Sequence, residues 1–131
     1  MSAVERVEVG IVSRDHALVD FYVEVFGLEE VPAEVFPGSG TLHRLRSRGS
    51  VTMKVMVPVE PPEAGGGGAL LAAQGLRYLS LWVDDFDGVL ARFTDKGGTL
   101  VHGPVELGPG SRLVVLTDPD GNSIEVVEAV D

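Results

Sequence analysis

Cysteine is absent from the 131-residue sequence, which excludes disulfide bonds, thiolate catalysis and cysteine-ligated zinc. Basic side chains are few, because 10 Lys and Arg stand against 20 Asp and Glu, and the formal net charge is −10. This charge argues against nucleic acid and anionic membrane surfaces as partners. No apolar run approaches the roughly 18 residues that a membrane-spanning helix needs. Met1 is followed by a strand-like pattern without a basic or signal-type apolar block, so we expect a cytoplasmic protein.

Hydrophobic residues make up 44% of the chain, which is enough to form a core. The length predicts a single domain, residues 1–131, or two small modules that share a core.

The first module is predicted to cover residues 1–58. Val4–Val12 alternates as a strand does, Asp15 is a suitable helix N-cap, and apolar residues at helical spacing run to Gly27, a typical C-terminal stop. Three further strands are predicted at 28–36, 41–46 and 50–57. Pro32 indicates an edge strand or a bend. The order is therefore β-α-β-β-β.

Residues 59–75 contain two adjacent prolines and four consecutive glycines, which is typical of a flexible linker. The second module, residues 76–131, repeats the β-α-β-β-β order. Its elements are a strand at 76–83, a helix capped by Asp85 and ended by Gly97-Gly98, and strands at 99–107, 112–117 and after the Asp118–Asn122 turn. Asp15 and Asp85 lie 70 positions apart, as do Gly27 and Gly97, which indicates an internal duplication.

Each helix can cover one face of its sheet, and the other face is predicted to be more polar. In the first module that face carries Glu8 and Gly10, and in the second it carries Tyr78, Ser80 and Trp82. A mixed face of this kind is typical of the wall of a ligand cavity. We therefore expect an α+β fold in which two curled mixed sheets surround a shared cleft, with Glu125 joining it from the last strand.

Three stretches together resemble the vicinal oxygen chelate superfamily, which includes glyoxalases, bleomycin resistance proteins and extradiol dioxygenases. They are Val9–Val12 with Phe21-Tyr22 and Phe26-Gly27-Leu28, Leu79–Asp85, and Asp118–Glu125. The resemblance spans essentially the whole chain. It implies a small-molecule ligand and a homodimer, in some members with swapped modules.

The resemblance also implies where a divalent metal would bind: on the first and last strands of each module. These positions hold Glu8, Tyr78, Glu125 and Lys54, or Met56 if the strand register slips. A tyrosine hydroxyl stays protonated near pH 7, and a lysine ammonium about 4 Å away repels a cation by about 4 kcal/mol at an effective dielectric of about 20. We therefore expect no metal. If one binds, Glu8 and Glu125 are its ligands and Ni, Co, Mn, Fe or Zn the candidates.

Two classes of function remain open at this point. The first is a metal-independent small-molecule-binding protein of the bleomycin-resistance type that sequesters an aromatic or planar compound, with Lys54, Tyr78, Ser80 and Trp82 as ligand contacts. The second is a lyase or isomerase of the glyoxalase or epimerase type that acts through Glu8 and Glu125, with or without a metal. An extradiol dioxygenase is disfavoured, because its iron site needs two histidines and one carboxylate.

The three histidines fall outside the positions that the resemblance implies for a metal. His16 is expected to be solvent-exposed in the first helical turn, and His43 and His102 to be surface or packed residues on strands, with pocket lining as the alternative. Arg44, Arg46 and Arg48 indicate either a solvated strand edge or an anion-binding mouth.

Overall fold

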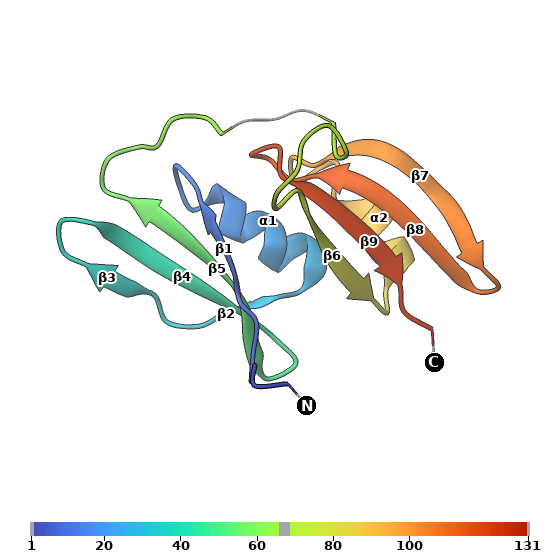
Figure 1. Ribbon diagram of the computed structural model, residues 1–131, viewed down its shortest axis with the longest axis horizontal. Coiled ribbons are helices and arrows are strands. Elements are labelled where there is room, and N and C mark those ends of the chain that lie inside the picture. The colour runs from blue at the N-terminus through green and yellow to red at the C-terminus, as the bar shows by residue number, and fades with distance from the viewer. Residues whose placement is uncertain (1, 66–68, 131) are drawn as a thin grey trace. The chain divides into compact units, whose positions relative to one another are not determined.

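Each half of the sequence builds one helix and one mixed sheet, and the α+β prediction is confirmed (Figure 1). The computed structural model describes residues 2–65 and 69–130, so part of the predicted glycine-rich linker, residues 66–68, lies outside the described residues. The chain divides into two units, Met1–Ala64 and Gly65–Asp131. We call them unit 1 and unit 2.

Unit 1 contains a sheet with strand order β1-β5-β4-β2, and β3 also pairs with β4. The β1 strand is parallel to β5, and the other pairs are antiparallel. The elements are β1 (Val9–Val12), α1 (Ala17–Phe26), β2 (Glu29–Glu30), β3 (Glu34–Phe36), β4 (Gly40–Ser47) and β5 (Ser50–Pro58).

Two elements of unit 1 differ from their predicted bounds. The first strand begins at Val9, five residues later than predicted, and Val7 is exposed. The predicted strand 28–36 is divided into β2 and β3, with Pro32 in the gap. Proline has no amide hydrogen to donate to a ladder, so the backbone leaves the sheet there and returns.

The ends of α1 follow the sequence signals. The Asp15 carboxylate accepts a hydrogen bond from the Ala17 amide at 2.9 Å, although His16 occupies the N-cap position. Gly27 ends the helix in the left-handed conformation, with φ 71°, and its N–H donates to the Val23 carbonyl. The helix therefore begins and ends within one or two residues of the predicted signals.

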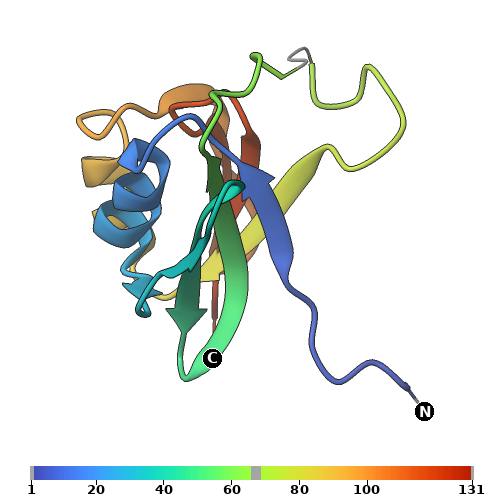
Figure 2. The same cartoon turned by 90° about the vertical axis from the view of Figure 1, so that its left-hand side faces the viewer.

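One face of the unit 1 sheet is covered by α1, and no described helix of this unit covers the other, which we call the open face (Figure 2). The covered face carries Leu45, Met53 and Val55, which are buried together with apolar residues of α1. Burying each such side chain contributes about 1.5–3 kcal/mol. Because side chains alternate along a strand, the intervening residues of β4 and β5, such as Leu42 and Lys54, lie on the open face.

Unit 2 contains a sheet with strand order β6-β9-β8-β7, in which β6 is parallel to β9. Its elements are β6 (Tyr78–Val83), α2 (Phe86–Arg92), β7 (Thr99–Gly108), β8 (Ser111–Thr117) and β9 (Ser123–Glu128). Asp85 caps α2 by accepting the Gly88 amide at 3.1 Å, as predicted. The helix ends at Arg92, before the predicted stop at Gly97-Gly98, and turns fill the interval.

The turn before β9 is organised by the buried carboxylate of Asp118. It accepts hydrogen bonds from the backbone amides of Asp120 and Asn122, both at 2.9 Å, and from the Asn122 side chain. Ile124 and Val126 then enter the core under α2. Glu125, between them, is directed to the opposite face of the sheet.

Candidate functional site

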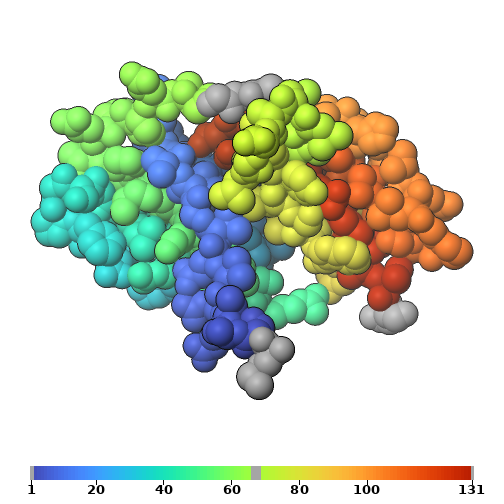
Figure 3. Space-filling model, in the orientation of Figure 1, coloured from blue at the N-terminus to red at the C-terminus, as the bar shows by residue number. Residues whose placement is uncertain are grey.

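The open face of unit 1 contains a pocket with a lysine on its wall. The register pairs Gly10 with Lys54, and a Cβ atom added at Gly10 would lie 3.7 Å from the Lys54 Cε. The lysine side chain therefore runs across the glycine. The pocket has a volume of about 520 Å³ and is lined mostly by apolar side chains. Its lining residues are Gly10, Ile11, Val12, Phe36, Ser39, Leu42, Lys54 and Met56. The space-filling view shows β1, in blue, at the surface of this unit (Figure 3).

Glu8 lies just before β1 and is held by two cations. Its carboxylate accepts a hydrogen bond from Arg6 Nε at 3.0 Å, and the Lys54 Nζ lies 3.9 Å from its Oε1. The hydrogen bond from Arg6 outweighs burial and, with the charges of Arg6, Lys54 and Arg44, lowers the pKa of Glu8. Glu8 is therefore ionised and neutralised within unit 1.

The open face of unit 2 brings Ser80 and Glu125 together. The strand register pairs these two residues, and the Ser80 hydroxyl donates to Glu125 Oε1 at 2.9 Å. Tyr78 and Trp82 lie two positions before and after Ser80 on β6 and are 50% and 67% exposed. Glu125 is half-buried. This face offers the aromatic rings of Tyr78 and Trp82, the hydroxyls of Tyr78 and Ser80, and the carboxylate of Glu125.

The two registers settle which residue of unit 1 corresponds to Glu125. Gly10 and Ser80, 70 positions apart, face Lys54 and Glu125, which are 71 positions apart. One inserted residue in the second half accounts for the difference. Lys54 therefore takes the equivalent place, whereas Met56 pairs with Val12.

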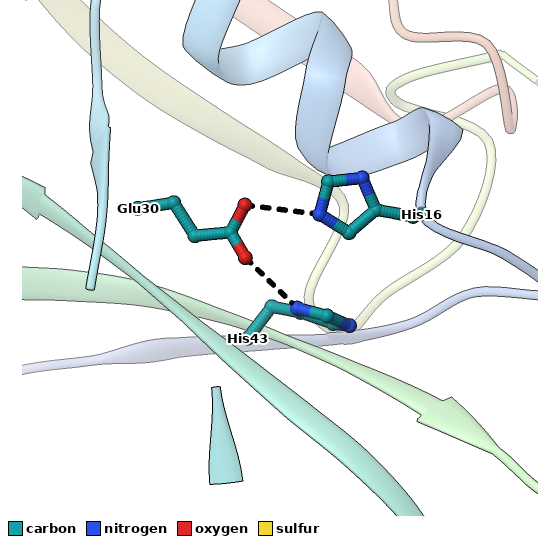
Figure 4. A group of neighbouring side chains, drawn as sticks. All are labelled: His16, Glu30 and His43. Atoms are coloured by element: carbon teal, nitrogen blue, oxygen red, sulfur yellow. Dashed lines mark hydrogen bonds and ion pairs between the residues drawn. The ribbon is translucent and has the colours of Figure 1, made fainter. Parts of the chain in front are cut away.

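A second polar group lies on the helix side of unit 1 and was not predicted as a site. His16 Nε2 is 2.9 Å from Glu30 Oε1, and His43 Nδ1 is 3.0 Å from Glu30 Oε2 (Figure 4). The two imidazole rings meet edge to face, with centroids 4.7 Å apart. His102, the third histidine, lies in unit 2 on β7. His16 is exposed, as expected, and His43, expected to be a surface or packed residue, is half-buried, but their partnership was missed.

The charges in this group support one another. Burial lowers the pKa of His16, but its hydrogen bonds and attraction to Glu30 and Asp20 outweigh burial and raise it. Burial likewise raises the pKa of Glu30, and the hydrogen bonds from His43 and His16 outweigh it and lower that pKa.

Comparison with known families identifies the fold. The family model of the Glyoxalase/Bleomycin resistance protein/Dioxygenase superfamily matches residues 9–126. The chain belongs to this superfamily. Comparison with curated proteins finds no match for the sequence.

Solved structures of superfamily proteins share this fold at low sequence identity. A glyoxalase family protein from Bacillus cereus is 19% identical, with a TM-score of 0.81 over 99% of this chain and 97% of the other. Glyoxalase I from Leishmania major is 17% identical, with a TM-score of 0.76 over 96% of this chain and 87% of the other. TnmS3, an antibiotic-binding protein from a Streptomyces species, is 24% identical, with a TM-score of 0.64 over 99% and 100%.

The strand positions that the resemblance implies for a metal hold side chains whose chemistry does not suit a divalent ion. In unit 1 the Glu8 carboxylate is already bonded to Arg6, and Lys54 adds an ammonium 3.9 Å away that can only donate. In unit 2 the positions hold Tyr78 and Glu125, and Glu125 accepts a hydrogen bond from Ser80.

No helix within residues 2–65 and 69–130 is both long and apolar enough to cross a membrane.

Proposed function

We propose that this protein binds a planar aromatic small molecule without a metal and sequesters it. The observation that carries the proposal is the pocket of unit 1, where Lys54 lies among apolar side chains and pairs with Gly10. An apolar pocket with a few oriented polar groups is the usual form of a small-molecule site.

The lining suggests the chemistry of the ligand. Phe36, Leu42 and Met56 offer an apolar and polarisable surface for a ring, and the Lys54 ammonium favours an acidic or acceptor group at the ring's edge. On unit 2 we propose that Trp82 stacks on a ring, that Tyr78 donates a hydrogen bond, and that Ser80, whose hydroxyl donates to Glu125, accepts one. The resemblance in fold to an antibiotic-binding protein supports a small-molecule ligand.

A fluorescent probe tests the pocket directly. The anilinonaphthalene sulfonate ANS carries planar rings and one anionic group, so it matches the lining. We expect saturable binding with enhanced fluorescence and about ten- to a hundredfold weaker affinity in Lys54→Met, because the lost hydrogen bond to a charged group is worth about 1.5–3 kcal/mol. Lys96→Met removes the other lysine of the chain, which lies in unit 2, and should leave affinity unchanged.

Equal ANS affinity in Lys54→Met and the unaltered protein would contradict binding at this pocket. If Lys54→Met does weaken ANS binding, displacement of ANS by a panel of planar aromatic antibiotics identifies ligands. Each ligand is then recovered, and its mass, NMR spectrum and optical activity are measured, because an isomerisation leaves the mass unchanged. A ligand unchanged in all three supports sequestration.

A lyase or isomerase acting through Glu8 and Glu125 is the second candidate function. The Ser80–Glu125 hydrogen bond favours it, because a carboxylate held by a hydroxyl is positioned as an acid or base would be. A recovered ligand with altered structure, formed by the unaltered protein and not by Glu125→Gln, would establish this activity and overturn sequestration.

A further inference from the structure

We propose that His16, Glu30 and His43 form a binding site for a borderline divalent cation, with Zn²⁺ as the best match. The proposal does not depend on the function proposed above, because the group shares no residue with the pocket.

Strand pairing explains how these residues meet. Glu30 on β2 pairs with Leu45 on β4, and His43 lies two positions from Leu45 on the same face. Leu45 and Val55, which pairs with His43, are fully buried on the side that α1 covers. His16 then approaches from the start of α1. The group therefore lies on the helix side of the sheet, opposite the face that bears Lys54.

The donor atoms suit a transition metal. Two imidazole nitrogens and a carboxylate form a set that Zn²⁺ accepts at about 2.0–2.2 Å from each ligand atom, so in tetrahedral geometry neighbouring ligand atoms lie about 3.3–3.6 Å apart. The two His–Glu separations are 2.9 and 3.0 Å, and all the ligand atoms lie within 4.8 Å of one another. Small rotations of the half-exposed His16 and of Glu30 would complete the coordination. Nitrogen ligands disfavour Mg²⁺ and Ca²⁺.

Asp20 supplies the support that metal-binding histidines usually have. Its Oδ1 lies 3.1 Å from His16 Nδ1, while Nε2 of the same ring faces Glu30. A carboxylate on Nδ1 fixes the ring so that Nε2 is directed at the metal. The His16 side chain is 44% exposed and that of His43 12%, so one side of the group is open to solvent for an entering ion and for water as a further ligand.

The charge of the molecule favours a cation. The formal net charge is −10, and a negative field raises the local concentration of cations. The alternative is a group that holds only protons and ties α1 to the sheet. Both descriptions use the same contacts, so a measurement of metal binding must decide between them.

Calorimetric titration of the untagged, chelator-free protein with ZnCl₂ tests the proposal. We expect about one ion per chain, affinity at least tenfold weaker in both His16→Ala and Glu30→Gln, and about 10–100-fold weaker in Asp20→Asn. His102→Ala removes the histidine outside the group and should bind as the unaltered protein does. Co²⁺ should give a visible absorption band that is lost in His16→Ala and kept in His102→Ala.

Three results would overturn the proposal. The absence of saturable binding would mean that the group holds only protons and connects α1 to the sheet. Unchanged affinity in both His16→Ala and Glu30→Gln would place the ion elsewhere. Affinity that falls in Glu8→Ala or Glu125→Ala and not in His16→Ala would assign it to the open faces. Urea denaturation of each variant checks that the fold is retained, and Glu30→Gln keeps the side-chain shape if His16→Ala does not fold.

Discussion

Asp118 is the residue whose side chain holds the turn that leads into β9, the strand that carries Glu125. It is 2% exposed, and its carboxylate satisfies the backbone amides of Asp120 and Asn122 in the turn before β9. We expect Asp118→Ala to lower the free energy of unfolding by about 2–4 kcal/mol, because buried donors lose a charged acceptor. Urea denaturation measures the loss.

Asp118→Asn is the graded comparison for this prediction. The amide keeps one carbonyl oxygen that can accept from the two backbone amides, so we expect a smaller loss than for Asp118→Ala. An Asp118→Ala variant as stable as the unaltered protein would contradict the role of this carboxylate in the turn.

Single residues were predictable where local chemistry fixes them. Asp85 as a cap and Gly27 as a stop follow from backbone hydrogen bonding and positive φ, and the sequence shows both. The His16–Glu30–His43 group depends on the register between β2 and β4, and a shift of one residue would direct Glu30 to the other face. One sequence carries no direct signal for that register.

Arg112 links three elements of unit 2. From β8 it makes two hydrogen bonds to Glu128 on β9, both 3.0 Å, and one to Asp87 on α2, while its guanidinium lies 4.6 Å from the centroid of the Phe86 ring. A bidentate pair of this kind is stronger than a single ionic contact. Arg112 therefore joins α2 to β8 and β9.

This link predicts a pH dependence of stability. The hydrogen bonds from Arg112 lower the pKa of Glu128 below its ordinary 4.5. The stabilisation is therefore complete above about pH 4.5 and is lost as the pH falls through the lowered pKa of the folded state. We expect Glu128→Gln to have a lower urea midpoint than the unaltered protein at pH 7, and the difference to shrink below pH 4.5.

Asp95→Asn is the control, because Asp95 is an exposed carboxylate in the turn after α2 of the same unit. It should leave the midpoint nearly unchanged at both pH values. A difference between Glu128→Gln and the unaltered protein that stays constant from pH 7 to below pH 4.5 would show that the ion pair is not its source.

Elements were predicted best where hydrophobic periodicity is unbroken. The strands at 40–47, 50–58 and 123–128 agree with the pattern to within a residue or two. The strand predicted at 28–36 is divided, because Pro32 removes a ladder donor in its middle. The α2 helix is shorter than its apolar spacing indicates. Phe93, which continues that spacing, is buried in the core although it follows the last helical residue, and turns occupy the chain from there to Gly97.

At the scale of the whole molecule, the family could be predicted from the internal duplication, whereas no single site residue indicates it. The 70-residue offset and three short stretches were enough for the superfamily, which the family model now shows. The metal question was harder, because two separate groups of side chains bear on it. Total metal content cannot distinguish Glu8 and Glu125 from the His16 group, so every metal measurement needs variants of both.

Homodimer formation is the remaining prediction at this scale, and it follows from the family rather than from a contact. Two copies would bring together formal charges of −10 each, so association must bury enough apolar surface to outweigh repulsion. Screening reduces that repulsion, because the Debye length falls as salt is added. We therefore expect sedimentation velocity to show a species of twice the chain mass whose fraction grows with protein concentration and from about 0.02 M to about 0.3 M NaCl. A single species of the chain's own mass under all these conditions would contradict a homodimer, and the ligand pocket of unit 1 would then have to act within one chain.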